Sequence, residues 1–341
     1  MKIGIITFHD GLNHGAYLQA FSTMMFLREK SHDVFIINYK NRLHDKKEGY
    51  TQIFKYRNPF RIIDFLKKKK AFKISQKKLY LTPFTTNPMD ILSLKFDLII
   101  VGSDVVWNTD IFGFDNIYFG GLINCKQISY AASFGWGEPN EEIIGMIKKG
   151  INNFSDISVR DKRSQSIIEN LTNKIPDIVV DPVFLTQWNL YEKISERIQD
   201  LPPFILIYAY KLDEMEIEHI IEYAKNNNLI SISIGYRQKW CDSNYLDVDP
   251  FEWLGFFKKA SRVITSTFHG TIFSIIYNKR FYVSINEKNK SRIETLLELT
   301  DLNNIVESNV KDALTYDARN SLKMMNKNII KSKKWLINSI K

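Results

Sequence analysis

The chain has 341 residues, 44% of them hydrophobic and 25% charged, a balance that is typical of a globular protein and excludes a disordered chain. Its 47 Lys and Arg against 38 Asp and Glu give a net charge of +9, which favours an anionic partner: a phosphorylated ligand, nucleic acid or an acidic membrane surface. The two cysteines, Cys125 and Cys241, predict neither a disulfide framework nor a zinc site. Because no run of about 18 apolar residues occurs, we expect a cytoplasmic protein without a signal peptide or a membrane-spanning helix.

The positive charge is concentrated in two segments. Residues 40–78 hold fourteen Lys and Arg, including the run Lys67–Lys70, against three acids, which gives a net charge of +11. After Asp317, seven more Lys and Arg follow without an acid, so the remainder of the chain carries −9. We interpret the lysine run as a solvated surface. Contact with lipid headgroups is the alternative, because aromatic residues lie nearby: Phe54, Tyr56, Phe60 and Phe65.

Strand and helix patterns alternate through the first 200 residues. Residues 2–8 are predicted to form a buried strand, 16–29 a helix and 33–39 a second strand, which together begin a strand–helix–strand unit. Further strands are predicted at 96–101, 126–132, 156–159 and 177–180, with helices at 141–153 and 162–170. This alternation predicts a mainly parallel sheet covered by helices on both faces.

A second α/β domain is predicted after the turn Leu201-Pro202-Pro203. Its strands are expected at 204–210, 229–234, 262–265 and 281–285, and its helices at 213–226, 250–260, 270–278 and 291–299. Residues 311–341 are predicted to form a basic amphipathic helix that packs back on the domains, with a membrane-surface helix as the alternative. We therefore expect an α/β protein with Rossmann-like domains at 1–200 and 201–310 that face a cleft.

Sheets of this kind bind ligands beyond the carboxyl ends of their strands, so the segments that follow the strands are the candidate sites. After the first strand, the segment from His9 through Asn13 to Gly15 allows a tight turn into a helix whose N–H groups favour an anion. Either His9 or His14 is a candidate ligand contact. The segment is not the dinucleotide-binding fingerprint, and a purely structural turn is the alternative.

Polar residues also follow the third and fifth predicted strands. Ser103, Asp104 and Asn108 bring three hydrogen-bonding side chains to one place, and Asp104 is a candidate general base or a clamp for a substrate hydroxyl. Its alternative role is to cap a short helix. Arg160 is suited to a bidentate grip on a carboxylate or phosphate, with an Arg–Asp surface pair as the alternative.

The most prominent candidate lies in the second domain, in the segment 262–274. There a strand leads through a hydroxyl-rich turn with Ser266 and Thr267 into a helix that opens with His269, Gly270 and Thr271. This pattern predicts an anion-binding turn with a titratable imidazole at its edge, although a single histidine is also compatible with a structural role.

These segments, taken in order, resemble the polysaccharide pyruvyl transferases over about residues 1–300. The resemblance rests on Thr7-Phe8-His9, Asn13-His14-Gly15-Ala16, Leu18-Gln19-Ala20, Val101-Gly102-Ser103-Asp104, Trp107-Asn108, Tyr130-Ala131-Ala132-Ser133-Phe134-Gly135, Ser158-Val159-Arg160, Val180-Asp181-Pro182 and Ser266-Thr267-Phe268-His269-Gly270. It implies a GT-B-like fold and transfer of pyruvate from phosphoenolpyruvate onto two hydroxyls of a sugar, which forms a cyclic ketal on a cell-surface polysaccharide, such as a capsule or exopolysaccharide, or on its lipid-linked precursor. One departure is Thr267, where some members carry an arginine.

On this basis we expect His269 and Asp104 to be catalytic, with His269 as the acid or phosphate contact and Asp104 as the base or acceptor clamp. The expected donor-binding residues are Arg160, Ser266, Gly270, Thr271 and Arg292. The expected acceptor-binding residues are His9, Asn13, Gln19, Ser103 and Asn108. The scheme needs no metal or cofactor, and its partners are phosphoenolpyruvate, a sugar acceptor and, through the basic segments, the membrane surface, but not nucleic acid.

Two other functions compete with pyruvyl transfer. A GT-B-type glycosyltransferase that uses a nucleotide sugar shares the two-domain architecture, and Asp247-Val248-Asp249 resembles a metal-binding DxD triplet, although such a short pattern is also typical of an ordinary loop. A basic module that binds membrane or nucleic acid is the non-enzymatic alternative.

Overall fold

The computed structural model of the chain describes residues 1–41, 59–121, 125–306, 308–316 and 321–341. Phe54 and Tyr56 of the predicted basic segment, and the side chain of Phe60, lie outside the described residues. The chain forms two compact units. Unit 1 consists of residues 1–62, 76–186 and 328–341, and unit 2 of residues 63–75 and 187–327.

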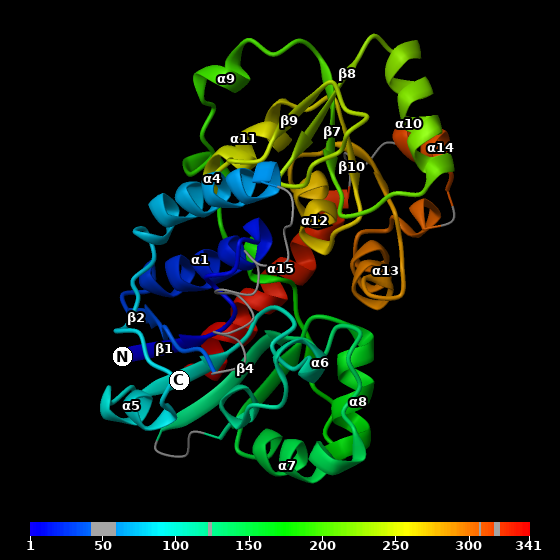
Figure 1. Cartoon of the computed structure of the whole chain (residues 1–341). Helices are drawn as coiled ribbons and strands as arrows, with labels where there is room; N and C mark the ends of the chain where they lie inside the picture. Colours follow the sequence, from blue (N-terminus) through cyan, green and yellow to red (C-terminus); the bar gives the residue numbers. More distant parts are fainter. Residues whose placement is uncertain (42–58, 122–124, 307, 317–320) are drawn as a thin grey trace. The chain divides into compact units, whose positions relative to one another are not determined.

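Unit 1 is built on a parallel sheet that has six strands within its described residues. The strands are β1 (Lys2–Ile6), β2 (Asp33–Ile36), β3 (Leu98–Val101), β4 (Lys126–Ala132), β5 (Asp156–Val159) and β6 (Asp177–Ile178). Their order in the sheet is β2-β1-β3-β4-β5-β6 (Figure 1). Because the chain proceeds from β1 first to one side and later to the other, the topological switch point lies between β1 and β3, where ligands of such sheets bind.

Helices cover both faces of this sheet. They are α1 (His14–Arg28), α5 (Pro88–Ser93), α6 (Thr109–Phe112), α7 (Glu141–Ile151) and α8 (Lys162–Thr172), with short 3-10 turns at η1 (Asn116–Phe119) and η2 (Pro182–Leu185). Figure 1 shows α7 and α8 on the face opposite α1. Under α7, the buried Trp107 ring lies 6.2 Å from Phe119 and 5.3 Å from Phe134. This aromatic packing fixes the segment that follows β3.

The last helix, α15 (Ser321–Ser339), returns to unit 1 with residues 328–341. Ser332 accepts a hydrogen bond from the Val180 N–H at 3.0 Å, and the Trp335 indole donates to Asp177 at 3.0 Å. The Trp335 ring also packs on Tyr130 of β4. Leu336 and Ile340 near the end of the helix are buried as well.

Unit 2 contains a second parallel sheet, with five strands in its described part and the order β11-β10-β7-β8-β9. The strands are β7 (Phe204–Tyr208), β8 (Ile230–Ile234), β9 (Ser243–Tyr245), β10 (Arg262–Thr265) and β11 (Arg280–Val283). By the same reasoning, its switch point lies between β7 and β10. The sequence does not predict β9, because a polar strand of three residues has no hydrophobic pattern.

The helices of unit 2 pack against alternate residues of the sheet. They are α9 (Glu196–Gln199), α10 (Glu214–Asn226), α11 (Pro250–Lys259), α12 (Phe268–Ile276), α13 (Lys290–Leu299) and α14 (Val310–Thr315), with 3-10 turns at η3 (Trp188–Leu190) and η4 (Asn303–Ile305). Ile205 and Ile207 of β7 join the core under α10 and α14. Phe204 and Tyr208 instead contact Phe256 and Trp253 of α11. Burial on both faces explains why β7 is apolar throughout.

Helix α4 (Pro59–Gln76) precedes β3 in sequence, yet its residues 63–75 belong to unit 2. Arg237 of unit 2 donates to the Asp64 carboxylate through Nε at 3.0 Å and Nη2 at 2.7 Å. Phe72, two turns further along α4, is buried. The α4 side chains spaced four residues apart thus form its docking face.

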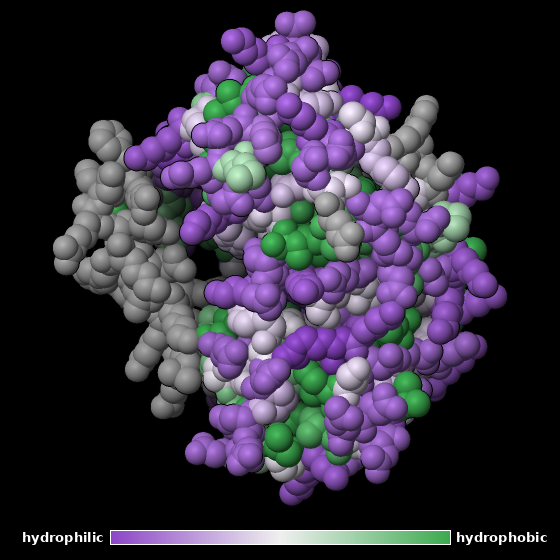
Figure 2. All heavy atoms as spheres, turned by 90° about the vertical axis from the view of Figure 1, so that its right-hand side faces the viewer, coloured by the Kyte–Doolittle hydropathy of each residue, from purple (hydrophilic) through white to green (hydrophobic). Residues whose placement is uncertain are grey.

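The structure confirms the predicted α/β fold class with two Rossmann-like sheets. Among the helices that the structure describes, none combines the length and hydrophobicity needed to cross a bilayer. The face of the molecule in Figure 2 is mainly hydrophilic, and its hydrophobic side chains gather in small separate patches rather than in one broad area.

Candidate functional site

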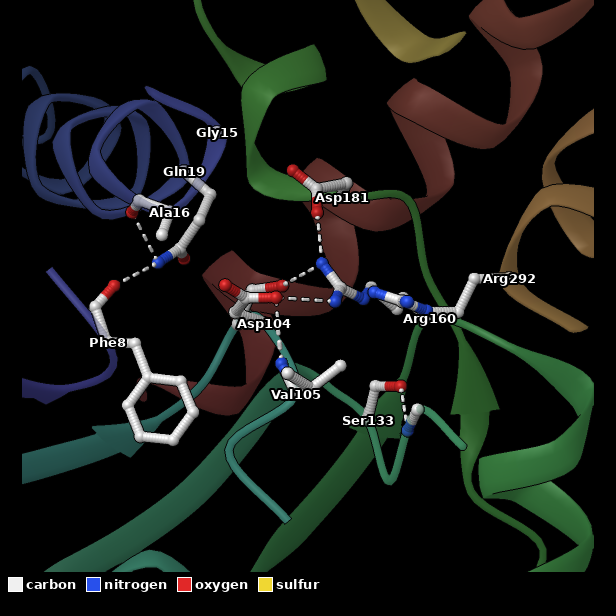
Figure 3. A network of polar contacts seen from close by, with 12 residues as sticks. Phe8, Gly15, Ala16, Gln19, Asp104, Val105, Ser133, Arg160, Asp181 and Arg292 are labelled. Atoms are coloured by element: carbon white, nitrogen blue, oxygen red, sulfur yellow. Dashed lines mark hydrogen bonds and ion pairs between the residues drawn. The ribbon is translucent and has the colours of Figure 1, made fainter. Parts of the chain in front are cut away.

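In unit 1, hydrogen bonds join the segments that follow β1 and β3 at the switch point. The Thr7 hydroxyl donates to the Ser103 carbonyl at 2.8 Å. The Gln19 amide on α1 donates to Thr7 Oγ1 at 2.9 Å and to the Phe8 carbonyl at 3.1 Å (Figure 3). His9 Nδ1 donates to the Thr7 carbonyl at 3.1 Å. The predicted acceptor-side residues His9, Gln19 and Ser103 therefore lie in one buried network.

Asp104 lies at the carboxyl end of β3 in an uncommon backbone conformation. Its φ of 73° and the φ of 107° at Gly102 are both in the left-handed region. A Cβ on Gly102 would lie 2.5 Å from the Tyr130 carbonyl oxygen, so only glycine fits there. For aspartate such a conformation is strained, and strain of this kind concentrates at functional sites.

Arg160 joins the ends of three strands (Figure 3). Its Nη2 donates to Asp104 Oδ1 at 2.8 Å, and its Nη1 donates to Asp181 Oδ2 at 2.8 Å. The arginine is only 3% exposed. Asp181 also caps η2 by accepting from the Val183 N–H at 3.1 Å. The guanidinium, which the sequence predicts as a donor contact, is therefore held between two carboxylates of its own chain.

The carboxylates of this cluster stabilise the charge of Arg160. Burial alone would lower the pKa of Arg160, but Asp104 and Asp181, with a contribution from Asp161, raise it above its ordinary value. A sugar hydroxyl can donate a hydrogen bond to carboxylates of this kind.

A group of buried serines continues the network along the ends of β4 and β5. The Ser133 hydroxyl donates to Asp161 Oδ2 at 2.6 Å and accepts from the Gly135 N–H at 2.9 Å. Ser164 on α8 accepts from the Phe134 N–H at 3.0 Å, and its own N–H donates to Asp161 Oδ1 at 2.8 Å. These contacts fix the loop after β4, whose small residues permit close approach of a ligand.

Two of the predicted acceptor-binding residues cap helices. Asn13 Oδ1 accepts from the Gly15 and Ala16 N–H groups at 3.0 and 3.2 Å, so these two donors at the start of α1 are engaged within the turn. Asn108 Oδ1 accepts from the Asp110 N–H at 3.0 Å. The buried Nδ2 of Asn108 has no hydrogen-bond partner among the described residues, which leaves this donor for a ligand or water.

In unit 2, the turn between β10 and α12 lies at the other switch point. Thr267 caps α12 by accepting from the Gly270 N–H at 3.0 Å, and the Thr271 N–H donates to the Thr267 carbonyl at 3.1 Å. Ser266 Oγ accepts from the Tyr210 N–H at 2.9 Å, which joins this turn to the segment after β7. The Gly270 and Thr271 N–H groups, predicted to bind the donor, thus form bonds within the helix start.

His269 is buried in the first turn of α12, edge-on to the Phe268 ring at 5.5 Å. The guanidinium of Arg292 on α13 lies 5.6 Å from the Phe268 ring centroid. Arg292 Nη2 donates to the Lys288 carbonyl at 2.8 Å. The structure therefore places three of the predicted residues, His269, Ser266 and Arg292, around the start of one helix.

The Asp247-Val248-Asp249 triplet has a structural role. Asp247 forms an ion pair with Arg197 at 2.9 Å, and Asp249 caps α11 by accepting from the Phe251 and Glu252 N–H groups. No group of three or more His, Cys, Asp or Glu that could hold a metal ion occurs in the described parts of the chain.

Sequence reasoning did not assign a role to Asp181, Asp161 or Ser133, although they complete the unit 1 network. The sequence around Asp181 does indicate a helix cap, because an aspartate followed by a proline at the end of a strand is typical of the start of a helix. The contact of Asp181 with Arg160, across the end of the sheet, has no counterpart in residue spacing.

Comparison with solved structures identifies the class of fold. The chain is similar to an S. aureus MnaA–UDP co-structure, with a TM-score of 0.53, 14% identity and coverage of 99% of this chain and 95% of that chain. A putative UDP-N-acetylglucosamine 2-epimerase from Listeria monocytogenes matches with a TM-score of 0.51, 11% identity and coverage of 98% and 90%. The UDP-GlcNAc 2-epimerase of Methanocaldococcus jannaschii, in complex with UDP-GlcNAc and UDP, matches with a TM-score of 0.50, 13% identity and coverage of 97% and 99%. At these identities the likeness establishes the fold alone, which is GT-B-like.

Within this class, the sequence itself identifies the family. The polysaccharide pyruvyl transferase family model matches residues 13–288, and the chain therefore belongs to that family. The matched region contains most of the candidate residues of both units, while His9 and Arg292 lie just outside it. A search of the curated proteins found no match.

Proposed function

We propose that the protein transfers pyruvate from phosphoenolpyruvate onto two hydroxyls of a sugar and forms a cyclic ketal during synthesis of a cell-surface polysaccharide. The family match over residues 13–288 is the observation that carries this proposal. The two switch-point clusters support it because they differ in side-chain chemistry: unit 1 presents carboxylates and amides, whereas unit 2 presents an imidazole, hydroxyls and a guanidinium. A sugar and an anionic donor need these two different environments.

The reaction needs one acid and one base. Protonation of the methylene carbon of phosphoenolpyruvate makes its C2 an oxocarbenium-like electrophile, to which the first sugar hydroxyl adds as it loses its proton. The second hydroxyl then displaces phosphate from C2 and closes the ketal. The protein must therefore supply a proton donor near the donor carbon, a base near the sugar, and contacts for carboxylate and phosphate.

In unit 1, we assign Asp104 as the base or acceptor clamp. Arg160 becomes a positioning residue for Asp104 rather than a donor contact, because both of its terminal nitrogens bond to carboxylates of this unit. His9, Gln19, Ser103 and Asn108 would contact or support the sugar, and Asn13 would order the first turn of α1. This assignment agrees with the ability of a carboxylate to accept a hydrogen bond from a sugar hydroxyl.

In unit 2, we assign His269 as the proton donor or phosphate contact, with Ser266 and Arg292 as further donor contacts. The Ser266 hydroxyl accepts a hydrogen bond from Tyr210 and still has its own proton to donate. The Gly270 and Thr271 N–H groups contribute through the electrostatic field of the helix start, since both already form hydrogen bonds.

The test is incubation of the protein with phosphoenolpyruvate and a panel of lipid-linked sugars. We expect release of phosphate and a mass gain of the sugar that matches a pyruvate ketal. His269→Gln should abolish both, whereas His219→Gln on α10 is the matched control. Stabilisation by nucleotide sugars but not by phosphoenolpyruvate would instead support a glycosyltransferase and would refute the proposal.

We further propose that the outer face of α4 brings the protein to an acidic membrane surface that carries the lipid-linked acceptor. Ile63, Leu66 and Ile74 lie at helical spacing and are 48%, 51% and 60% exposed. Lys67 and Lys70 lie on the same face, and such a mixture of apolar and basic side chains favours anionic lipid headgroups. Replacement of both Lys67 and Lys70 by glutamate should reduce sedimentation of the protein with phosphatidylglycerol vesicles. The same replacement should leave turnover of a water-soluble acceptor unchanged. Equal sedimentation of the variant would exclude this contact.

A further inference from the structure

One lysine of the run 67–70 differs from its neighbours. Lys67, Lys69 and Lys70 are exposed, whereas Lys68 lies on the docking face of α4, between Asp64 and the buried Phe72. These three residues are spaced four apart and therefore share one side of the helix. The Lys68 ammonium is directed into unit 2, where it donates to the Gly235 carbonyl at 3.2 Å.

The contacts of the Lys68 ammonium with the described residues are uncharged. It lies 5.0 Å from the centroid of the Tyr236 ring, and no carboxylate pairs with it within the described residues. Asp64, one helical turn away, is the nearest acid along α4, but it pairs with Arg237 instead. Burial, with the neighbouring tyrosines, holds the pKa of the Tyr236 phenol well above its ordinary value, so this side chain is neutral and supplies no negative charge.

Lys68 lies at the end of the sheet where ligands bind. Gly235 directly follows β8, and the adjacent Tyr236 ring is 4.1 Å from the ring of Tyr210, which follows β7. The Tyr210 N–H in turn donates to Ser266 Oγ at the switch point. A continuous row of contacts therefore leads from Lys68 to the turn that precedes His269.

We propose that Lys68 binds a carboxylate or phosphate group of the anionic donor at the carboxyl ends of the unit 2 strands; this inference rests on the proposed function for the identity of the donor as phosphoenolpyruvate. An ammonium held by one carbonyl and by the rings of Tyr236 and Phe72 is a site that a small anion completes, because the anion supplies the missing charge. Burial lowers the pKa of the Lys68 ammonium to about 8, and a bound anion would offset that desolvation. The turn before His269 offers Thr267, an uncharged residue, so the donor needs cations from elsewhere in this unit.

The first experiment uses the unaltered protein. Limited acetylation at neutral pH, followed by peptide mass spectrometry, reports the reactivity of Lys68, with Lys67 and Lys69 as internal controls. We expect phosphoenolpyruvate to slow acetylation of Lys68 and to leave both controls unchanged. Separate additions of inorganic phosphate and pyruvate then show whether the phosphate or the carboxylate occupies the site. Equal labelling of Lys68 with and without all three anions would overturn the inference.

The second experiment measures kinetics. A charge-assisted contact that is lost in Lys68→Met should raise the KM for phosphoenolpyruvate by about tenfold to a hundredfold, with a smaller effect in Lys68→Arg and none in Lys69→Met. If the unaltered protein turns over phosphoenolpyruvate but Lys68→Met keeps its KM, the inference fails and the proposed function stands. If phosphoenolpyruvate is not a substrate but phosphate still protects Lys68, the proposed function fails and the anion site stands.

Discussion

Replacement of Arg160 by methionine tests whether this residue is held as a buried ion-pair centre or is available to a ligand. The guanidinium bonds to Asp104 and Asp181 at 2.8 Å each, and its side chain is 1% exposed. Methionine fills much of the same volume but removes this cation from the two carboxylates. Breaking a buried pair in this way costs about 3–5 kcal/mol, which is a large part of the 5–15 kcal/mol that stabilises an ordinary domain.

The assay is urea unfolding followed by near-ultraviolet circular dichroism. We expect the free energy of unfolding of Arg160→Met to fall by about 3–5 kcal/mol, which lowers the urea midpoint by on the order of 1–2 M. Arg163→Met is the matched control, because Arg163 is the second residue of α8 and pairs with a glutamate that is 85% exposed. Its loss should be about 0–1 kcal/mol.

The pH dependence of this loss gives a second readout. Arg160 forms ion pairs only with ionised carboxylates, so the difference between Arg160→Met and the unaltered protein should shrink at pH values below about 4, the ordinary pKa of an aspartate. A loss no larger than that of Arg163→Met, or one that is independent of pH, would refute the assignment of Arg160 as the positioning residue for Asp104.

Three further predictions follow from local geometry. Gly102→Ala should lower the free energy of unfolding by about 1–3 kcal/mol, because φ at Gly102 is 107° and the new Cβ would meet the Tyr130 carbonyl. Gly145→Ala in α7 should raise the free energy of unfolding by about 0.5–1 kcal/mol, because a Cβ there meets nothing within 4 Å. Equal effects of the two substitutions in thermal unfolding would contradict this prediction. Because burial holds the pKa of Lys68 at about 8 against an ordinary 10.5, the unfolded chain binds this proton more tightly, and stability should gain from Lys68 as the pH rises from 8 to 10.5. Denaturation curves of Lys68→Met should lack this gain and those of Lys67→Met should keep it. Burial raises the pKa of the Cys241 thiol to about 12, so the folded protein should resist alkylation at Cys241 at pH 8, and rapid modification there would show that the segment opens.

The hydrophobic patterns predicted most of the sheet, because strands buried on both faces are continuous apolar runs. β4, β5 and β10 have the predicted bounds, and the candidate segments at the strand ends follow from the parallel topology. The helix caps were also readable, since Asn13 and Thr267 stand where short polar side chains satisfy the first N–H groups of a helix.

Contacts between distant parts of the sequence could not be predicted in the same way. Nothing in the lysine run distinguishes Lys68 from Lys67, because the distinction depends on the packing of α4 in unit 2. Arg160 is similar: its type suits a phosphate as well as a carboxylate, and only the position of Asp181 determines which of them it meets. The roles that the sequence indicated for single residues therefore depended on neighbours that the sequence did not reveal.

The division of the chain between the units has a consequence for its synthesis on the ribosome. Residues 63–75 emerge early but belong to unit 2, and residues 328–341 emerge after unit 2 yet belong to unit 1. The first sheet therefore stays incomplete until the second sheet has been synthesised, because Trp335, which packs on the Tyr130 ring, is not yet present. The nascent protein should need protection from aggregation over that interval, and neither unit can be exchanged between relatives as one uninterrupted stretch of gene.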